Sequence, residues 1–304
     1  MVPVLVGPTA SGKTAVAHAI ARQLPTGIVS ADSRQIYRRL DIGTAKPSAA
    51  ERSSFLYYGL DVVEPDASYA AGRFARDAGA WLGEIAAQGR LPLVVGGTGF
   101  YLRALFEGLF EEPVLDGTRR ARLRAALGVL SADERLRWAG RLDPEYRGGR
   151  NAQRLSRVIE ISLLAGVPLS RLQREHPSRP AAAPYYARID LPRELLQERI
   201  RLRVRDMLKA GFIDEVRAEL SRGTREDAPG LTGVGYRDVI RHIAGELPFG
   251  KLEDAIVVAT RQYAKRQETW FRHQLPEQVL VLDGTLPPDA LAAELLSGYR
   301  AACA

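Results

Sequence analysis

The stretch from Gly7 to Thr14, Gly-Pro-Thr-Ala-Ser-Gly-Lys-Thr, restricts the fold of this chain more than any other feature. It fits the pattern G-x-x-x-x-G-K-[ST] without a mismatch. The apolar run Val2–Val6 comes before it, and an amphipathic helical pattern from about Lys13 to Leu24 follows. A strand, a glycine-rich turn and a helix in this order are typical of a phosphate-binding P-loop. The motif therefore predicts an α/β fold with a parallel sheet.

The residue types of this loop suit an anionic ligand. Glycines let the backbone curl so that several N–H groups point at phosphate oxygens, and the helix N-terminus adds partial positive charge. Lys13 supplies a mobile cation, and the Thr14 hydroxyl is placed to bind Mg²⁺. We therefore predict that the phosphates are bound by Gly7, Pro8, Thr9, Ala10, Ser11, Gly12, Lys13 and Thr14.

Strand and helix patterns alternate over the first 110 or so residues, which predicts a P-loop NTPase-like parallel sheet flanked by helices. The patterned segments are a strand at Gly27–Ser30, a helix at Ser68–Gln88, a strand at Leu91–Val95 and a helix that ends at Phe106. After a break at Glu111-Glu112-Pro113, only helical patterns appear from Asp116 to about Leu172, and a proline-rich stretch at 176–184 closes this block. These helices are Arg119–Leu127, Ala132–Arg141 and Ala152–Ala165.

The α/β pattern then returns. We expect a strand at Tyr185–Leu191, a helix from Pro192 to Gly211, a long helix at Lys251–His273 and a last strand at Val279–Leu282. The predicted organisation is thus a core of residues 1–112 and 185–304, interrupted by an all-helical domain of residues 113–184.

The net charge of +7 is concentrated in this helical segment. Between Pro113 and Tyr185 the chain holds 14 arginines, no lysine and 7 acids, so the remainder is close to neutral. Such asymmetry favours a surface for a polyanion, of which nucleic acid is the most common, although a solvated basic helix face would look similar. The single cysteine, Cys303, leaves no disulfide or cysteine metal site, and no apolar run is long enough to span a membrane. We expect a cytoplasmic enzyme.

Two further strand ends carry candidate site residues. Leu93-Val94-Val95 leads into Gly96-Gly97-Thr98-Gly99 and lacks the acid that usually holds Mg²⁺ in P-loop NTPases. An acid follows the neighbouring strand instead, at Asp32, and should face the P-loop because strand C-termini line the ligand crevice. Asp32 could alternatively cap a helix at Ser33–Leu40. The pattern favours transfer chemistry, in which either a phosphate moves from a nucleotide or a diphosphate leaves another group.

The residues closely resemble the tRNA dimethylallyltransferase (tRNA isopentenyltransferase) family. The matching stretches, in the order of that family, are Gly7–Thr14, Ser30–Tyr37, Asp41–Pro47, Gly96–Tyr101, Asn151–Arg157, Gly233–Arg237 and Tyr263–Arg272. The P-loop alone is not specific, whereas Asp-Ile-Gly-Thr-Ala-Lys-Pro and Ala-Lys-Arg-Gln-x-Thr-Trp together are. The match extends from residue 7 to residue 272, with no departure at the positions named.

The resemblance implies transfer of a dimethylallyl group from dimethylallyl diphosphate to N6 of the adenosine 3′ to the anticodon, with Mg²⁺ and release of diphosphate. It implies that the P-loop binds the diphosphate, that Asp32 takes the N6 proton, and that Arg203 stabilises the leaving group. Thr98 would hold the diphosphate or the flipped base. The helical domain would grip the anticodon stem-loop, and we expect a monomer with no membrane association.

The resemblance also implies a set of tRNA contacts. These are Asp32, Ser33, Arg34, Gln35, Thr98, Gln153, Arg154, Leu155, Ser156, Arg157, Thr232, Gly233, Val234, Gly235, Tyr236, Arg237, Lys265, Arg266, Gln267 and Arg272. For the aromatic and aliphatic positions an ordinary packing role is a competing interpretation, because such residues at helical spacing are more often core.

Three other functions compete with this interpretation. A P-loop small-molecule kinase of the shikimate or gluconate kinase type would share the loop and the glycine-rich strand end, but it would need ATP and no basic helical insertion. A prenyltransferase acting on free adenine nucleotides would not need the insertion either. A non-catalytic RNA-binding module would leave the P-loop and Asp32 without a purpose.

Overall fold

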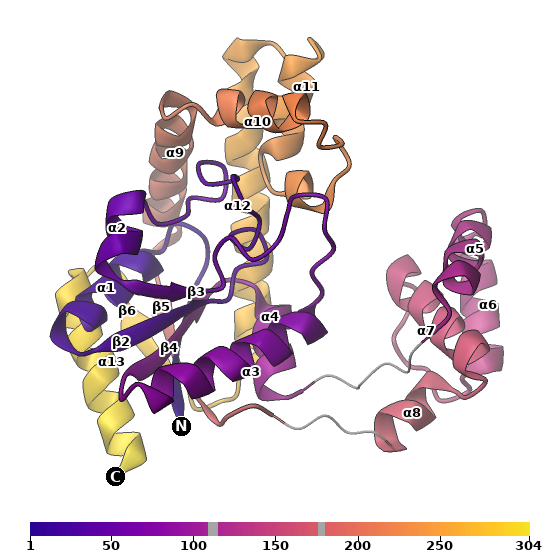
Figure 1. Cartoon of the computed structure of the whole chain (residues 1–304), viewed down its shortest axis with the longest axis horizontal. Helices are drawn as coiled ribbons and strands as arrows, with labels where there is room; N and C mark the ends of the chain where they lie inside the picture. Colours follow the sequence, from indigo (N-terminus) through magenta and orange to yellow (C-terminus); the bar gives the residue numbers. More distant parts are fainter. Residues whose placement is uncertain (109–114, 176–179) are drawn as a thin grey trace. The chain divides into compact units, whose positions relative to one another are not determined.

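The structure, a computed structural model of the chain, describes residues 1–108, 115–175 and 180–304. The chain divides into two compact units, which are described separately (Figure 1). Met1–Phe106 and Pro180–Ala304 form one, called the core unit, and Glu107–Arg179 form the other, called the helical unit. The predicted limits of the insertion were Pro113, which lies outside the described residues, and Pro184, which is the first residue of a core strand. Residues 176–179 of the predicted proline-rich stretch also lie outside the described residues.

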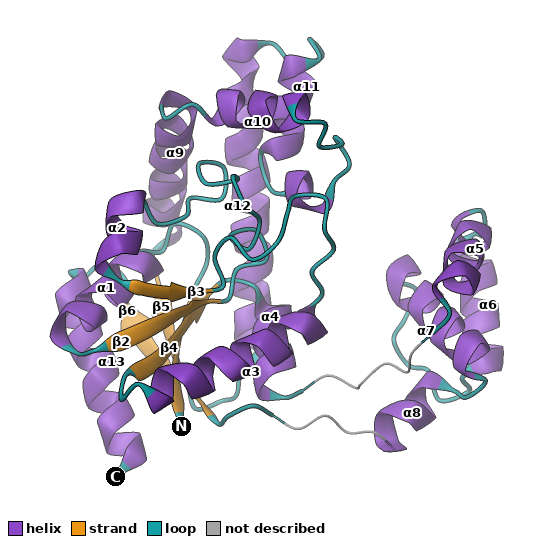
Figure 2. Ribbon diagram, in the orientation of Figure 1, coloured by secondary structure: helices purple, strands orange, loops and turns teal. Residues whose placement is uncertain are grey.

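The core unit contains a six-stranded sheet in the order β3-β2-β4-β1-β5-β6, and all its pairings are parallel (Figure 2). The strands are β1 (Val2–Val6), β2 (Thr26–Ser30), β3 (Leu56–Tyr58), β4 (Leu91–Gly96), β5 (Pro184–Asp190) and β6 (Leu280–Asp283). Val6 pairs with Gly96 and Ser30 with Val95, so β1, β2 and β4 end at the same edge of the sheet. The α/β fold with a parallel sheet is confirmed.

Helices cover both faces of this sheet (Figure 1). The helices of the core unit are α1 (Lys13–Gln23), α2 (Ala49–Ser54), α3 (Ala71–Ala87), α4 (Gly99–Phe106), α9 (Arg193–Lys209), α10 (Phe212–Ser221), α11 (Tyr236–Ile243), α12 (Phe249–Gln274) and α13 (Pro288–Cys303), with a short 3₁₀ helix at Pro229–Thr232. On one face α1 and α13 bury side chains such as Ile20 and Leu295 against Leu5 and Ile189. On the other face α3 approaches β2 closely, because a Cβ at Gly27 would lie 2.6 Å from the Ile85 side chain.

The helical unit contains, among its described residues, α5 (Gly117–Gly128), α6 (Ala132–Leu142), α7 (Ala152–Ala165) and α8 (Leu169–Glu175). Their buried faces meet in a separate apolar core that includes Leu127, Ala139, Leu155 and Ile159. The side chains of Asp116, Ser131 and Asn151 accept hydrogen bonds from first-turn amides and so start α5, α6 and α7. This unit has its own core and its own helix caps.

The predicted elements agree with the structure except in one loop. The bounds of α7 are as predicted, and α12 extends the predicted helix at both ends. A helix at Ser33–Leu40 is not found, because this segment forms turns and Tyr37 makes an isolated bridge with Val63. Arg39 has a positive φ of 62°, which is incompatible with a continuous helix.

Candidate active site

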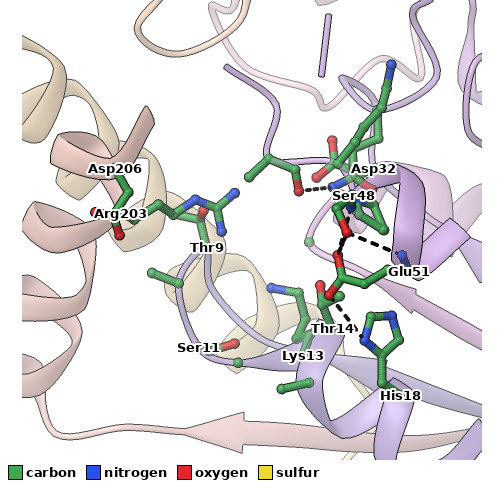
Figure 3. A pocket seen from close by; sticks show the side chains of 18 of the residues that line it. Thr9, Ser11, Lys13, Thr14, His18, Asp32, Ser48, Glu51, Arg203 and Asp206 are labelled. Carbon is green, nitrogen blue, oxygen red and sulfur yellow. Dashed lines mark hydrogen bonds and ion pairs between the residues drawn. The ribbon is translucent and has the colours of Figure 1, made fainter. Parts of the chain in front are cut away.

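The P-loop forms one wall of a pocket of about 1020 Å³ in the core unit (Figure 3). Residues Thr9–Thr14 line it, whereas Gly7 and Pro8 lie behind. Gly12 is the N-cap of α1 with a left-handed φ of 93°, and no side chain caps the helix. The first amides of α1 and the positive end of its dipole are thus open to a ligand, as an anion site requires.

Lys13 folds back over the loop. Its Nζ donates to the carbonyl oxygens of Gly7 at 2.9 Å and Pro8 at 2.7 Å. Burial, together with the nearby positive charge of Arg203, lowers the pKa of Lys13 to about 7, while the negative charge of Asp32 opposes this shift. The free pocket therefore disfavours the charge of the residue that should bind an anion. An anionic ligand would restore that charge.

Two arginines of α9 face the P-loop. Arg203 and Arg199 lie one helical turn apart and both line the pocket, and Figure 3 shows the Arg203 side chain extending from α9 toward it. Burial lowers the pKa of Arg203, and Asp32 partly offsets this shift. Arg199 Nη1 lies 3.8 Å from a Cβ built on Gly12, and its Nη2 donates to the Gly284 carbonyl. The structure places the predicted Arg203 at the site and adds Arg199, which the sequence interpretation had not assigned although it lies four residues earlier.

Asp32 also lines this pocket, as its position after β2 predicted. Its Oδ1 accepts a hydrogen bond from the backbone N–H of Arg34 at 2.8 Å, which fixes the carboxylate in a turn rather than at a helix cap. The Thr98 hydroxyl oxygen accepts from the N–H of Ser33 at 3.0 Å, and the hydroxyl donates to Ser33 Oγ at 3.4 Å. Burial and the Asp32 charge raise the pKa of Tyr263 to about 12, so Tyr263 is protonated at neutral pH. Thr98 itself does not line the pocket, and it connects the end of β4 to the Asp32 turn.

Glycines after β4 allow neighbouring segments to approach. A Cβ at Gly96 would lie 2.2 Å from the Ala31 carbonyl oxygen, and one at Gly99 would lie 2.3 Å from the Trp270 ring. Larger residues at these positions would push apart the ends of β2 and β4 or displace α12. The glycine-rich turn thus serves close packing around the site as well as ligand access.

The loop Asp41–Pro47 supplies another part of the pocket wall. The Glu215 carboxylate accepts from the backbone N–H groups of Asp41 and Ile42, both at 2.6 Å, and of Gly43 at 3.1 Å. It also accepts from the Tyr236 hydroxyl at 2.8 Å. Glu215 therefore fixes the shape of this loop. The sequence contained no signal for it, because the carboxylate is 172 to 174 residues away from the amides it binds.

Lys46, in the same loop, is an internal residue. Its side chain is fully buried, and its Nζ lies 2.8 Å from Asp41 Oδ1 and 2.7 Å from Asp61 Oδ1. Nζ also donates to the Tyr37 carbonyl. These contacts give Lys46 a structural role in holding the loop.

The predicted tRNA contacts divide by exposure. Those with exposed side chains are Gln153, Arg154, Arg157, Arg237, Lys265, Arg266 and Arg272. The half-buried ones are Asp32, Ser33, Arg34, Gln35, Thr98, Ser156, Thr232 and Val234. Arg34 joins two of the predicted segments, since its Nη1 donates to the Pro229 carbonyl and to the Thr232 hydroxyl oxygen.

Five of the predicted contacts have little exposed surface in this structure. Leu155, Gly233, Gly235, Tyr236 and Gln267 are buried. Leu155 belongs to the core of the helical unit, and the Tyr236 ring packs edge-on against Phe212. Gln267 lines the pocket although little of its surface is exposed. All five shape the surfaces that carry their exposed neighbours.

Together these features define a P-loop protein whose pocket can hold a polyanion beside a carboxylate. Comparison with known proteins identifies the family. The model of the IPP transferase family matches residues 35–274, and that of the isopentenyl transferases matches residues 1–56. The chain therefore belongs to the IPP transferase family.

Relatives of similar length have related names. The tRNA dimethylallyltransferase of Aromatoleum aromaticum is 41% identical, with 99% of this chain and 94% of the relative covered. That of Halorhodospira halophila is 43% identical, with 89% of each covered. The crystal structure of the tRNA isopentenylpyrophosphate transferase of Bacillus halodurans is similar with a TM-score of 0.72 at 29% identity, over 99% of this chain and 95% of that one. A eukaryotic dimethylallyltransferase acting on tRNA has a TM-score of 0.78 at 23% identity, over 93% of this chain and 73% of that one, which shows the shared fold. The comparisons favour the prenyltransferase interpretation over the kinase alternative.

The state of Lys13 predicts a proton uptake when the pocket binds inorganic diphosphate. Because the pKa of Lys13 is about 7 in the free protein, much of the population is neutral at pH 8, and an anion should restore the proton. Affinity should fall by up to about tenfold per pH unit above 7. Calorimetric titrations at pH 8 in buffers of different ionisation enthalpy measure the uptake. The control is Lys13→Arg, whose guanidinium stays charged, so only the proton uptake by diphosphate itself should remain. Equal proton uptake in the wild type and in Lys13→Arg would contradict the prediction.

Lys13 also has a consequence for folding. Its pKa in the folded protein lies below the ordinary value of 10.5, so between these two values the unfolded chain binds more protons than the native one. The contribution of Lys13 to stability is therefore least favourable at and below pH 7 and improves as the pH rises toward 10.5.

The contacts of Glu215 predict that Glu215→Ala lowers the free energy of unfolding by about 2–4 kcal/mol, because several amides and a tyrosine hydroxyl lose their acceptor. Denaturant unfolding measures this change. The neighbouring Asp214→Ala removes an exposed carboxylate that pairs with Arg217 and should change stability by less than about 0.5 kcal/mol. Equal effects of the two substitutions would show that Glu215 does not hold the loop.

Proposed function

We propose that this protein transfers a dimethylallyl group from dimethylallyl diphosphate to N6 of the adenosine 3′ to the anticodon of a tRNA. The observation that carries this proposal is the meeting of Asp32, Lys13 and Arg203 in one pocket. Cations suited to a leaving diphosphate thus lie close to a carboxylate suited to an entering amine. Family membership and the names of the relatives support the same reaction.

The chemistry follows from the charges. The exocyclic amine of adenine is a weak nucleophile, so the allylic carbon must develop positive charge as its bond to the diphosphate oxygen breaks. The bonding electrons leave with the diphosphate, which the P-loop amides, Lys13 and Arg203 stabilise. As the new bond between N6 and the allylic carbon forms, N6 loses a proton, and Asp32 accepts it.

The donors present fit a Mg²⁺ ion that depends on the substrate for most of its ligands. The Thr14 hydroxyl is exposed in the first turn of α1 beside the pocket. Within residues 1–108, 115–175 and 180–304 no group of three or more acidic, histidine or cysteine side chains is arranged to hold a metal. Mg²⁺ commonly binds through few protein ligands and several phosphate oxygens and waters. With the Thr14 hydroxyl as a protein ligand, such an ion would supply positive charge that neutralises the leaving group.

The RNA surface is assigned from exposed cations. In the helical unit, Gln153, Arg154 and Arg157 are exposed near the start of α7, and in the core unit Lys265, Arg266 and Arg272 are exposed on α12. Gln262, Lys265, Arg266 and Thr269 line a shallow hollow of about 360 Å³ on α12. Cations on both units suit the phosphates of an anticodon stem-loop.

The setting of the reaction completes the proposal. No helix in the described part of the chain is long and apolar enough to cross a bilayer. We expect a monomer to be active. The tRNA substrate leads us to expect action in the cytoplasm.

The reaction is tested by incubating the protein, Mg²⁺ and dimethylallyl diphosphate with unmodified tRNA or with AMP, followed by digestion and mass analysis. Prenylated adenosine from tRNA alone is expected. Asp32→Asn should lower turnover by about 10²–10⁴-fold, because it removes the proton acceptor but keeps an oxygen for the Arg34 amide. Its tRNA affinity should stay close to that of the wild type. Near-normal turnover of Asp32→Asn would exclude Asp32 as the base, and prenylation of AMP would exclude the tRNA-specific reaction.

The RNA surface predicts a change in salt dependence. Reversing charge at Arg154 and Arg157 should weaken tRNA binding and make the slope of log affinity against log salt shallower by about 1–2, since each phosphate contact contributes nearly one unit. Acidic residues near the start of α7 should not harm the helix. The charge-matched control reverses the exposed Arg217 and Arg300, in α10 and α13. Identical slopes for the two double variants would argue against α7 as an RNA contact.

A further inference from the structure

One buried side chain connects three separate parts of the active site. Gln267 of α12 is only 6% exposed. Its Oε1 accepts from the backbone N–H of Thr9 in the P-loop at 2.8 Å, and its Nε2 donates to the carbonyl of Gly97 at 2.9 Å. The reverse orientation of the amide would set donor against donor and acceptor against acceptor. The Gln267 side chain therefore ties the P-loop to the end of β4.

The surroundings fit this bridge closely. A Cβ at Gly97 would lie 2.2 Å from Gln267 Nε2, so only glycine leaves room for the amide. On the opposite side of the bridge, the P-loop passes through Ala10 with a positive φ of 64°. Such a conformation is unfavourable for alanine and persists only where neighbouring contacts hold it. The bond from Thr9 to Gln267 is a contact of this kind, one residue before the strained position.

Side-chain exposure changes sharply between neighbouring residues of α12. Lys265 and Arg266 are exposed, whereas Gln267 is buried. The resemblance to the family assigned all three to tRNA contact, and the exposed pair has side chains that can reach an RNA. The Gln267 amide already has a partner at each polar end. Its contacts are with the diphosphate side of the pocket.

We propose that Gln267 is a positioning residue for diphosphate binding. By holding Thr9 against Gly97, it keeps the P-loop in the open curve in which the amides after Thr9 face the ligand. Loss of the bridge leaves a buried N–H and a buried carbonyl without partners, and the loop should relax to satisfy them at the expense of the anion site. This inference rests on the proposed diphosphate-binding function and assigns one more residue to it.

Binding of inorganic diphosphate with Mg²⁺, measured by calorimetry, tests the inference separately from RNA binding. Gln267→Met keeps the length of the side chain and removes both hydrogen bonds. We expect the dissociation constant for diphosphate to rise at least about tenfold, and the KM for dimethylallyl diphosphate to rise by a similar factor. The dissociation constant for tRNA should stay within about twofold of wild type.

Gly97→Ala breaks the bridge from the other side, because the added methyl group displaces Nε2. If both substitutions act through one bridge, the double variant Gly97→Ala/Gln267→Met should lose less affinity than the product of the single losses. Gln274→Met is the matched control, since Gln274 is exposed at the end of the same helix, and it should leave diphosphate affinity unchanged. Thermal unfolding of each variant confirms that it is folded, and any one folded variant of the bridge is sufficient to decide.

The outcomes separate the two claims. If the wild-type protein neither binds diphosphate nor prenylates tRNA, the proposed function fails. If it does both and the folded Gln267→Met or Gly97→Ala variant binds diphosphate equally well, only the positioning role fails. A loss of tRNA affinity with unchanged diphosphate affinity would instead make Gln267 an RNA contact and overturn the inference.

Discussion

Lys13 and Arg203 face the same pocket, and the charge of Asp32 is the one that opposes the lowering of both their pKa values. Burial removes both cations from water, which is costly, and the charge of Arg203 adds a repulsion at Lys13. Here the cost appears as lowered pKa values for both groups. A site of this kind is incomplete without an anion. A diphosphate would stabilise both charges at once, and the affinity gained in this way is greatest for the separated, fully charged leaving group of the transfer reaction.

Close backbone approach keeps these charges in place. The ends of β1, β2 and β4 lie at one edge of the sheet, and the glycines after β4 let the Asp32 turn and α12 pack against it without intervening side chains. Hydrogen bonds across long sequence separations then fix each part. Thr98 holds the turn that carries Asp32, Glu215 holds the loop at Asp41–Gly43, and Gln267 holds the P-loop. Preorganisation in this pocket therefore depends mainly on a threonine hydroxyl, a glutamine amide and the half-buried carboxylate of Glu215, with the charged groups of the pocket attached to this frame.

Local patterns in the sequence predicted those parts of the site that are local in the chain. The P-loop, the strands around it and helices such as Ala152–Ala165 follow from motif and periodicity, because these signals span only a few neighbouring residues. Asp32 could be placed because parallel strands end at a common edge. The roles of Glu215 and Gln267 could not be predicted, because each depends on partners more than 150 residues away in the chain. The turns at 33–39 could not be predicted either, because they depend on a single strained backbone angle. Arg199 was within reach, as it lies one turn from Arg203 on the same helix.

The family motif on α12 contains both exposed and buried residues, and the geometry of a helix explains why. Successive residues of a helix point about 100° apart, so three adjacent positions cannot share one environment. Lys265 and Arg266 are exposed, whereas Gln267 is buried in the core unit. Comparison of the sequence alone assigned all three residues to tRNA contact. Tyr236 and Leu155 show the same division within other matching stretches, each buried beside exposed basic neighbours. Buried members of such motifs set the position of the exposed ones. In α12 this arrangement places the proposed RNA surface and the Gln267 bridge to the P-loop on one helix, so that the two proposed roles share a single support.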